Sequence, residues 1–89
     1  MIYGIYSVRD KLDGFIGPCV ERGDQLATRS FTTVVNSPDS KLFANPGDYD
    51  LYKIGEFDTE SGSIEPCLPS LVCSGASVFN PSLRGDTNA

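Results

Sequence analysis

The first ten residues place apolar side chains on both alternating faces of an extended chain. These side chains are Ile2, Tyr6 and Val8 on one face and Tyr3 and Ile5 on the other. A strand that is apolar on both faces belongs in the middle of a sheet. Asp13-Gly14 then predicts a turn, because Asp tolerates and Gly favours a positive φ. We therefore predict that the chain opens with a central strand.

A second, shorter strand is predicted over residues 15–20. Pro18 lacks a backbone N–H, which places this strand at an edge or at a break in pairing. A helix is predicted to begin at Gly23-Asp24, where the Asp carboxylate can accept from exposed backbone N–H groups. One face of this helix is apolar, because Leu26, Ala27, Ser30, Phe31, Val34 and Val35 follow at helical spacing. Asn36-Ser37-Pro38 stops the helix, because a residue before proline avoids the helical region.

The second half of the chain predicts a hairpin and a further short strand. Residues 37–48 form a polar connection that Leu42 and Phe43 pin to the core, and a turn signal ends it. A strand is predicted over residues 49–57, with Tyr49, Leu51 and Phe57 on one face. A hairpin loop follows, in which Gly62 can adopt the left-handed conformation. The chain then returns as a short strand over 63–65 that ends at Pro66, and a last strand is predicted over 71–73.

These elements predict a small α+β domain, with one helix packed on a mostly antiparallel sheet of about four to five strands. We expect residues 1–79 to form this single domain. Residues 80–89 are rich in Pro, Ser, Gly, Asp and Asn, and we expect them to form a flexible C-terminal tail.

The composition of the chain bears on the cellular compartment of the protein. No run approaches the roughly 20 apolar residues of a membrane helix, and the opening strand leaves no room for a signal peptide. Three cysteines, Cys19, Cys67 and Cys73, are an odd number, so we expect free thiols rather than a disulfide framework. These features indicate a protein of the cytoplasm that has no contact with a membrane.

Catalysis and metal binding have little support in the sequence. The chain has no histidine, so it lacks a ready acid or base near neutral pH and the usual partner of a nucleophilic Ser or Cys. Asp50, Glu56 and Asp58 could share a strand face and bind a hard cation, but the solvated acidic face of a hairpin explains them as well. We therefore expect no enzyme activity, no metal and no cofactor.

The charge is uneven along the chain. The net charge is −5, which opposes nucleic-acid binding, yet residues 1–41 hold as many basic as acidic groups. Any contact with phosphate is therefore expected from the N-terminal half. The candidate nucleic-acid-binding residues are Arg9, Lys11, Arg22 and Arg29 for phosphate, and Tyr3, Tyr6 and Tyr52 for stacking on bases. The alternative is that the aromatic side chains fill the core or a dimer interface. A homodimer that pairs through an open sheet edge is also expected.

Several segments together resemble a known family. They are Tyr3-Gly4-Ile5-Tyr6-Ser7-Val8-Arg9-Asp10, Gly14-Phe15, Ala27-x-Arg29-x-Phe31, Asp48-Tyr49-x-Leu51-Tyr52-x-Ile54-Gly55-Glu56-Phe57-Asp58 and Gly62-x-Ile64-Glu65-Pro66. This order is similar to that of the small nonstructural protein of gokushovirus-type microviruses, which are small phages with circular single-stranded DNA. The resemblance covers roughly residues 1–75.

The resemblance implies a nonstructural, DNA-binding protein that acts in genome replication or in the switch to single-strand synthesis and packaging. It brings no catalytic motif. The acidic net charge departs from this expectation, because counterion release by Lys and Arg normally drives such binding. We therefore expect a non-enzymatic phage protein of the host cytoplasm that binds single-stranded DNA. The alternative is an acidic dimeric adaptor that binds a viral or host protein.

Overall fold

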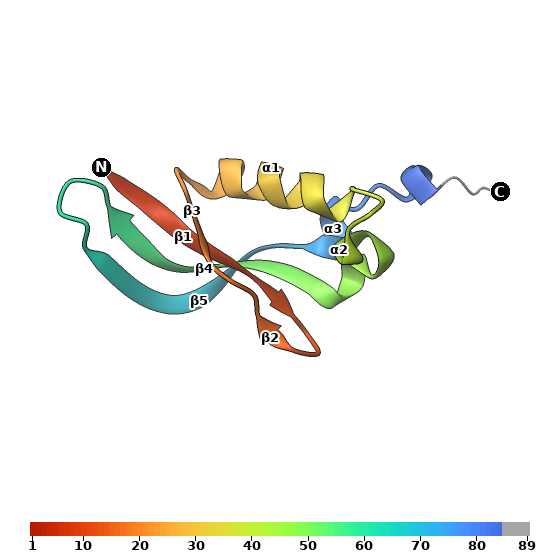
Figure 1. Ribbon diagram of the computed structural model, residues 1–89, viewed down its shortest axis with the longest axis horizontal. Coiled ribbons are helices and arrows are strands. Elements are labelled where there is room, and N and C mark those ends of the chain that lie inside the picture. Colours follow the sequence, from red (N-terminus) through yellow and green to blue (C-terminus); the bar gives the residue numbers. More distant parts are fainter. Residues whose placement is uncertain (85–89) are drawn as a thin grey trace.

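The computed structural model describes residues 1–84, and within them one antiparallel sheet carries a single long helix (Figure 1). The elements are β1 (Ile2–Asp10), β2 (Gly14–Phe15), β3 (Cys19–Glu21), α1 (Asp24–Val35), α2 (Lys41–Ala44), β4 (Tyr49–Asp58), β5 (Ile64–Ser74) and α3 (Gly75–Val78), with 3-10 turns at Pro46–Asp48 and Pro81–Arg84. The predicted α+β class is confirmed.

The central position of β1 is confirmed. The strand order is β2-β1-β4-β5, and β3 pairs with β1 on the same side as β2. Gly14 turns the chain from β1 into β2 with a φ of 97°. Pairing breaks between β2 and β3, where Pro18 offers no N–H, and there the Ser7 hydroxyl donates to the carbonyl of Ile16.

A bulge in β4 changes which side chains share a face. Ile5 pairs with Gly55, whereas its neighbour Tyr6 pairs with Lys53, so Ile54 is an extra residue on β4. One extra residue reverses the alternation of the strand beyond it. Tyr49 and Leu51 therefore face α1. The prediction that Phe57 shares their face is wrong, because Phe57 pairs with Tyr3 beyond the bulge.

The segment after the hairpin forms one strand of 11 residues, β5, rather than the two short strands predicted. Gly62 has a φ of 75°, as the loop requires. Pro66 does not end the strand, because β5 is an edge strand and its outward positions need no N–H. A second proline, Pro69, lies in the irregular part of the pairing with β4.

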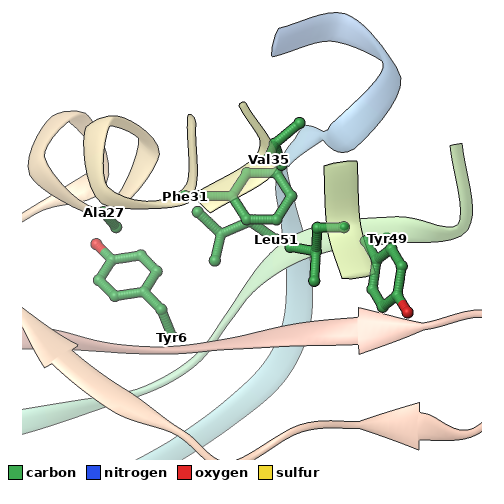
Figure 2. Packing of buried hydrophobic residues seen from close by; sticks show 7 residues of the cluster. Tyr6, Ala27, Phe31, Val35, Tyr49 and Leu51 are labelled. Carbon is green, nitrogen blue, oxygen red and sulfur yellow. The ribbon is translucent and has the colours of Figure 1, made fainter. Parts of the chain in front are cut away.

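Helix α1 closes the core from one side of the sheet (Figure 1). Ala27, Phe31 and Val35 are its buried residues, one turn apart, so they form a single apolar stripe. Tyr6 and Leu51 rise from the sheet to meet this stripe (Figure 2). The helix ends at Asn36, whose amide donates to the carbonyl of Thr32, as the Asn-Ser-Pro signal predicts.

The polar connection and the C-terminal segment close the far end of the core. Leu42 in α2 is buried, so its predicted role in holding the connection to the core is confirmed. Gly75 begins α3 against the backbone of Pro46. The predicted tail 80–89 is described only in part. Pro81–Arg84 form a 3-10 turn, and residues 85–89 lie outside the described residues.

Candidate functional site

Among residues 1–84, no helix lies over the face of the sheet that is turned away from α1 (Figure 1). Residues opposite each other in an antiparallel pair share a face, so the strand registers define this surface, here called the open face. Its positions are Tyr3, Ile5, Ser7 and Arg9 on β1, Phe57, Gly55, Tyr52 and Asp50 on β4, Ile64, Pro66, Leu71 and Ser74 on β5, Phe15 on β2 and Val20 on β3.

An aromatic pair lies on the open face near the end of β1. The Phe15 and Tyr52 rings meet edge to face, with their centroids 5.6 Å apart and their planes at 74°. Phe15 is exposed and Tyr52 is half-buried. Because the pair joins β2 to β4 across β1, it presents aromatic surface to solvent over the middle of the sheet.

The charges beside this pair come from three side chains. Arg9 is exposed and pairs directly with Phe15 on one side and Asp50 on the other. Lys11 Nζ lies 3.9 Å from Asp50 Oδ2 and donates to the carbonyl oxygen of Gly47 at 2.8 Å. Beside the aromatic pair, two cations therefore accompany the buried carboxylate of Asp50.

Tyr3 lies on the open face but apart from the aromatic pair. It is half-buried in a row that crosses three strands, Tyr3 on β1, Phe57 on β4 and Ile64 on β5. The three residues of this row are apolar or aromatic, and Phe57 is the aromatic neighbour of Tyr3 within it.

Tyr6 must be removed from the candidate binding residues. Its ring is buried between β1 and α1, beside Ala27 (Figure 2). The Tyr6 hydroxyl donates to Asp24 Oδ1 at 2.6 Å, and burial together with this carboxylate raises the pKa of Tyr6. The alternative of a core side chain therefore holds for Tyr6, because a base has no access to the ring.

Arg22 and Arg29 both lie apart from the aromatic pair. Arg29 is exposed on α1, away from its buried stripe, whereas Arg22 is exposed directly after β3, where Glu21 pairs with Gly4 beside Tyr3. The structure therefore gathers Arg9, Lys11 and Tyr52, and it sets Tyr3 further along the same face with Arg22 near it. Arg29 lies apart from them on the helix.

Phe15 was not among the candidate site residues predicted from the sequence, although it is exposed and pairs directly with Arg9. The signal lay in the spacing around the turn. A hairpin centred on residues 11–13 brings Phe15 opposite Arg9, as the pairing shows. The exposed position of Leu71 could not be found in this way, because the β4–β5 pairing around it is irregular. Val20 lies opposite Ile5, in a strand that resumes only after the break at Pro18.

The acidic side chains do not converge on one site. Asp50 lies on the open face, whereas Glu56 and Asp58 pair with Gly4 and Ile2 on the opposite face, so the idea of a shared face is wrong. Among residues 1–84, no three Cys, Asp or Glu side chains are placed to hold a metal ion. The three cysteines are free thiols. No helix in the described part of the chain is long and apolar enough to cross a bilayer.

One comparison with known proteins gives a match. The model of a family described as "Phage ORF5 protein" matches residues 3–78, which is most of the chain. The match includes the whole sheet apart from Ile2, and therefore all of the open face. No curated protein and no solved structure matches the chain.

Proposed function

The chain belongs to the Phage ORF5 protein family, and on this basis we propose that it is a non-enzymatic nonstructural protein of a gokushovirus-type microvirus. Its proposed role is to bind single-stranded DNA in the host cytoplasm during replication or packaging of the viral genome. The family match makes it a phage protein. The DNA-binding role rests on the open face of the sheet.

The observation that carries this proposal is the position of Arg9 beside exposed aromatic surface. Proteins that bind single strands without sequence preference combine stacking rings with cations that follow the backbone. Phe15 and Tyr52 supply the rings, and Arg9 pairs directly with Phe15. Lys11 lies against Asp50 and reduces its repulsion of a phosphate.

The proposed binding is weak and tolerant of sequence. Stacking on an aromatic side chain is worth about 1–3 kcal/mol per base. Only Arg9 and Lys11 stand near the rings, and the net charge of −5 repels DNA at a distance. Binding is therefore expected at low ionic strength and should fall as salt is added.

The test is a titration of the protein into a fluorescent oligothymidine, followed by anisotropy at several salt concentrations. Wild-type protein should bind at low salt, and Phe15→Ser and Tyr52→Ser should each weaken binding several-fold. Val34→Ser is the matched control, because Val34 is an equally exposed apolar residue on α1. No binding at low salt, or binding that is indifferent to salt, would refute the proposal.

A second candidate, a protein–protein adaptor, is favoured by the apolar part of the open face. The row of Tyr3, Phe57 and Ile64 has no charged member, which suits a protein partner better than DNA. In pull-downs from infected cells, Ile64→Asp should lose a viral or host protein that Val34→Asp retains. If both variants retain the same proteins, this face does not act as an adaptor surface.

A further inference from the structure

The strands of the sheet divide their charges between its two faces. Directly opposite residues share a face, so the registers assign each carboxylate of the strands to one side. The face that carries α1 holds all of them except Asp50, namely Asp10, Glu21, Glu56, Asp58 and Glu65. Asp50 is only 8% exposed and lies against Lys11. Within residues 1–84, the strands of this acidic chain therefore present no exposed carboxylate on the open face.

The end of the open face that is furthest from the aromatic pair repeats the composition of that pair. Tyr3 lies directly opposite Phe57, and both side chains are half-buried. Arg22 is exposed at this end, directly after β3, where Glu21 pairs with Gly4 beside Tyr3. Two rings with one exposed arginine thus occur at both ends of the face. The set of Tyr3, Phe57 and Arg22 is here called the second aromatic site.

We infer that single-stranded DNA bound at the aromatic pair continues along β1 to the second aromatic site, so that one strand occupies the whole length of the open face. This path rests on the proposed DNA-binding function and deepens it, because it names the length of strand that the face accepts. Rings that stack on bases, next to cations that contact phosphates, are the combination that binds single strands without sequence preference.

The distance between the two sites sets the length of DNA required. The second aromatic site lies in the row of Tyr3, whereas Tyr52 lies in the row of Ser7 and Phe15 in the row of Arg9. Residues in a strand rise about 3.3 Å each, so the sites are about 13–20 Å apart along β1. At the duplex rise of about 3.4 Å per nucleotide, about four to six nucleotide steps span this distance. An extended strand needs fewer steps, so a nonamer reaches both sites and a dinucleotide does not.

The middle of the open face does not obstruct this path. Ile5, Ser7 and Gly55 lie between the two sites, and all three are buried. They carry no charge, so a strand that passes over them meets neither a carboxylate nor a competing cation. The strongest contacts are therefore expected at the two ends of the face.

Charge favours a polyanion over a protein partner at the second aromatic site. The row of Tyr3, Phe57 and Ile64 is uncharged, but Arg22 adds a cation beside it. The carboxylates on the face that carries α1 repel DNA and so direct it to the open face. A strand held at both ends also binds more tightly than a strand held at one, because the second contact forms within a single complex.

The first test is anisotropy of a fluorescent oligothymidine nonamer with the full chain at low ionic strength. Tyr3→Ser should weaken binding at least about fivefold, the effect of losing one stacked base. Val34→Ser is the control, because Val34 is an exposed apolar residue on α1, and it should leave the affinity unchanged. If the nonamer binds Tyr3→Ser as tightly as wild type, the inferred path is wrong while the proposed DNA binding stands.

Arg22→Gln tests the phosphate contact without changing a ring. It should reduce the slope of log affinity against log salt for the nonamer by about one phosphate contact. Arg29→Gln should leave the slope unchanged, because Arg29 is exposed on α1. Equal slopes for wild type and Arg22→Gln would contradict a strand that reaches this end of the face.

NMR of isotope-labelled wild-type protein maps the path without any variant, and it replaces Tyr3→Ser if that variant does not fold. A thymidine dinucleotide should shift the amide signals around Phe15 and Tyr52. The nonamer should in addition shift those around Tyr3 and Phe57. Nonamer shifts confined to Phe15 and Tyr52 would overturn the inference and leave the second aromatic site to a protein partner. No binding of either oligonucleotide would refute the proposed function itself, and the inferred path with it.

Discussion

The Tyr6 ring leans back over Gly4, two residues earlier on the same face of β1. A Cβ atom at Gly4 would lie 2.5 Å from the Tyr6 hydroxyl oxygen and 2.6 Å from two ring carbons. The same hydroxyl donates to Asp24 at the start of α1. The missing side chain at Gly4 thus lets the central strand bring its tyrosine to the helix.

Gly4→Ala is therefore expected to destabilise the fold by about 1–3 kcal/mol, the usual effect of an extra methyl group in a packed site. Urea denaturation followed by circular dichroism measures the loss. Gly47→Ala is the control, because a Cβ there meets nothing within 4 Å. An equal effect of the two changes would contradict the close packing of Tyr6 on Gly4.

Gly75→Ala should be more damaging than Gly4→Ala, with a loss of about 3 kcal/mol or more. A Cβ at Gly75 would collide with the carbonyl oxygen of Pro46 and lie 2.7 Å from that of Tyr49. These are backbone atoms, which cannot rotate away as a side chain can. Denaturation midpoints of the two variants give the order, and a milder effect at Gly75 would show that α3 can shift.

Alkaline pH should destabilise the protein through Tyr6. Burial and the bond to Asp24 raise the pKa of Tyr6 in the folded state, so its contribution is complete below the unfolded value of about 10. Above that pH the unfolded state releases the proton first, and stability falls by up to about 1.4 kcal/mol per pH unit. Urea denaturation from pH 8 to 12 should show this decline.

Tyr6→Phe should reduce this alkaline decline and lower stability at neutral pH by about 1 kcal/mol, the value of one hydrogen bond. Part of the decline should remain, because burial also raises the pKa of Tyr49. A variant with the same pH profile as the wild type would show that Tyr6 ionises freely.

Acid should weaken the β4–β5 hairpin through Asp58. The backbone N–H of Glu60, at 2.9 Å, is the main cause that lowers the pKa of Asp58 in the folded state, and the N-terminal ammonium adds to it at 3.9 Å. This contribution is present above the unfolded value of about 3.9 and is lost as the pH falls below it. Asp58→Asn should be less stable than wild type at pH 6, and the difference should shrink toward pH 2 in urea denaturation.

The two faces of the molecule should differ in their response to salt. If DNA lies on the open face, Arg9→Gln should reduce the slope of log affinity against log salt by about one phosphate contact. Arg29→Gln should leave the slope unchanged, because Arg29 is exposed on α1 on the other side. Anisotropy titrations at several salt concentrations would compare them. A slope that Arg29→Gln reduces and Arg9→Gln leaves unchanged would place the DNA on α1.

Local signals predicted much of this fold. The doubly apolar opening identified the central strand, Gly14 and Gly62 adopt the positive φ expected of them, and α1 begins and ends at its sequence signals. These features depend on neighbours within a few residues, so the sequence carries them directly.

Other features could not be predicted, because they depend on pairing between distant strands. β5 continues through Pro66 since it lies at an edge, and edge position is a property of the whole sheet. The candidate site shows the same limit. Arg9 and Tyr52 meet through the β1–β4 register, whereas Tyr6 is buried because α1 covers its face. Residue type alone marks all three as candidates.

The bulge at Ile54 affects which substitutions in β4 act on the core and which act on the open face. The part of β4 before it contributes Tyr49 and Leu51 to the core, and the part beyond it contributes Phe57 to the open face. Deletion of Ile54 would restore strict alternation and turn one part of the strand inside out. With the bulge in place, the odd-numbered residues of one strand serve the core before residue 54 and the open face after it, so Phe57 can change while Tyr49 and Leu51 keep their packing under α1.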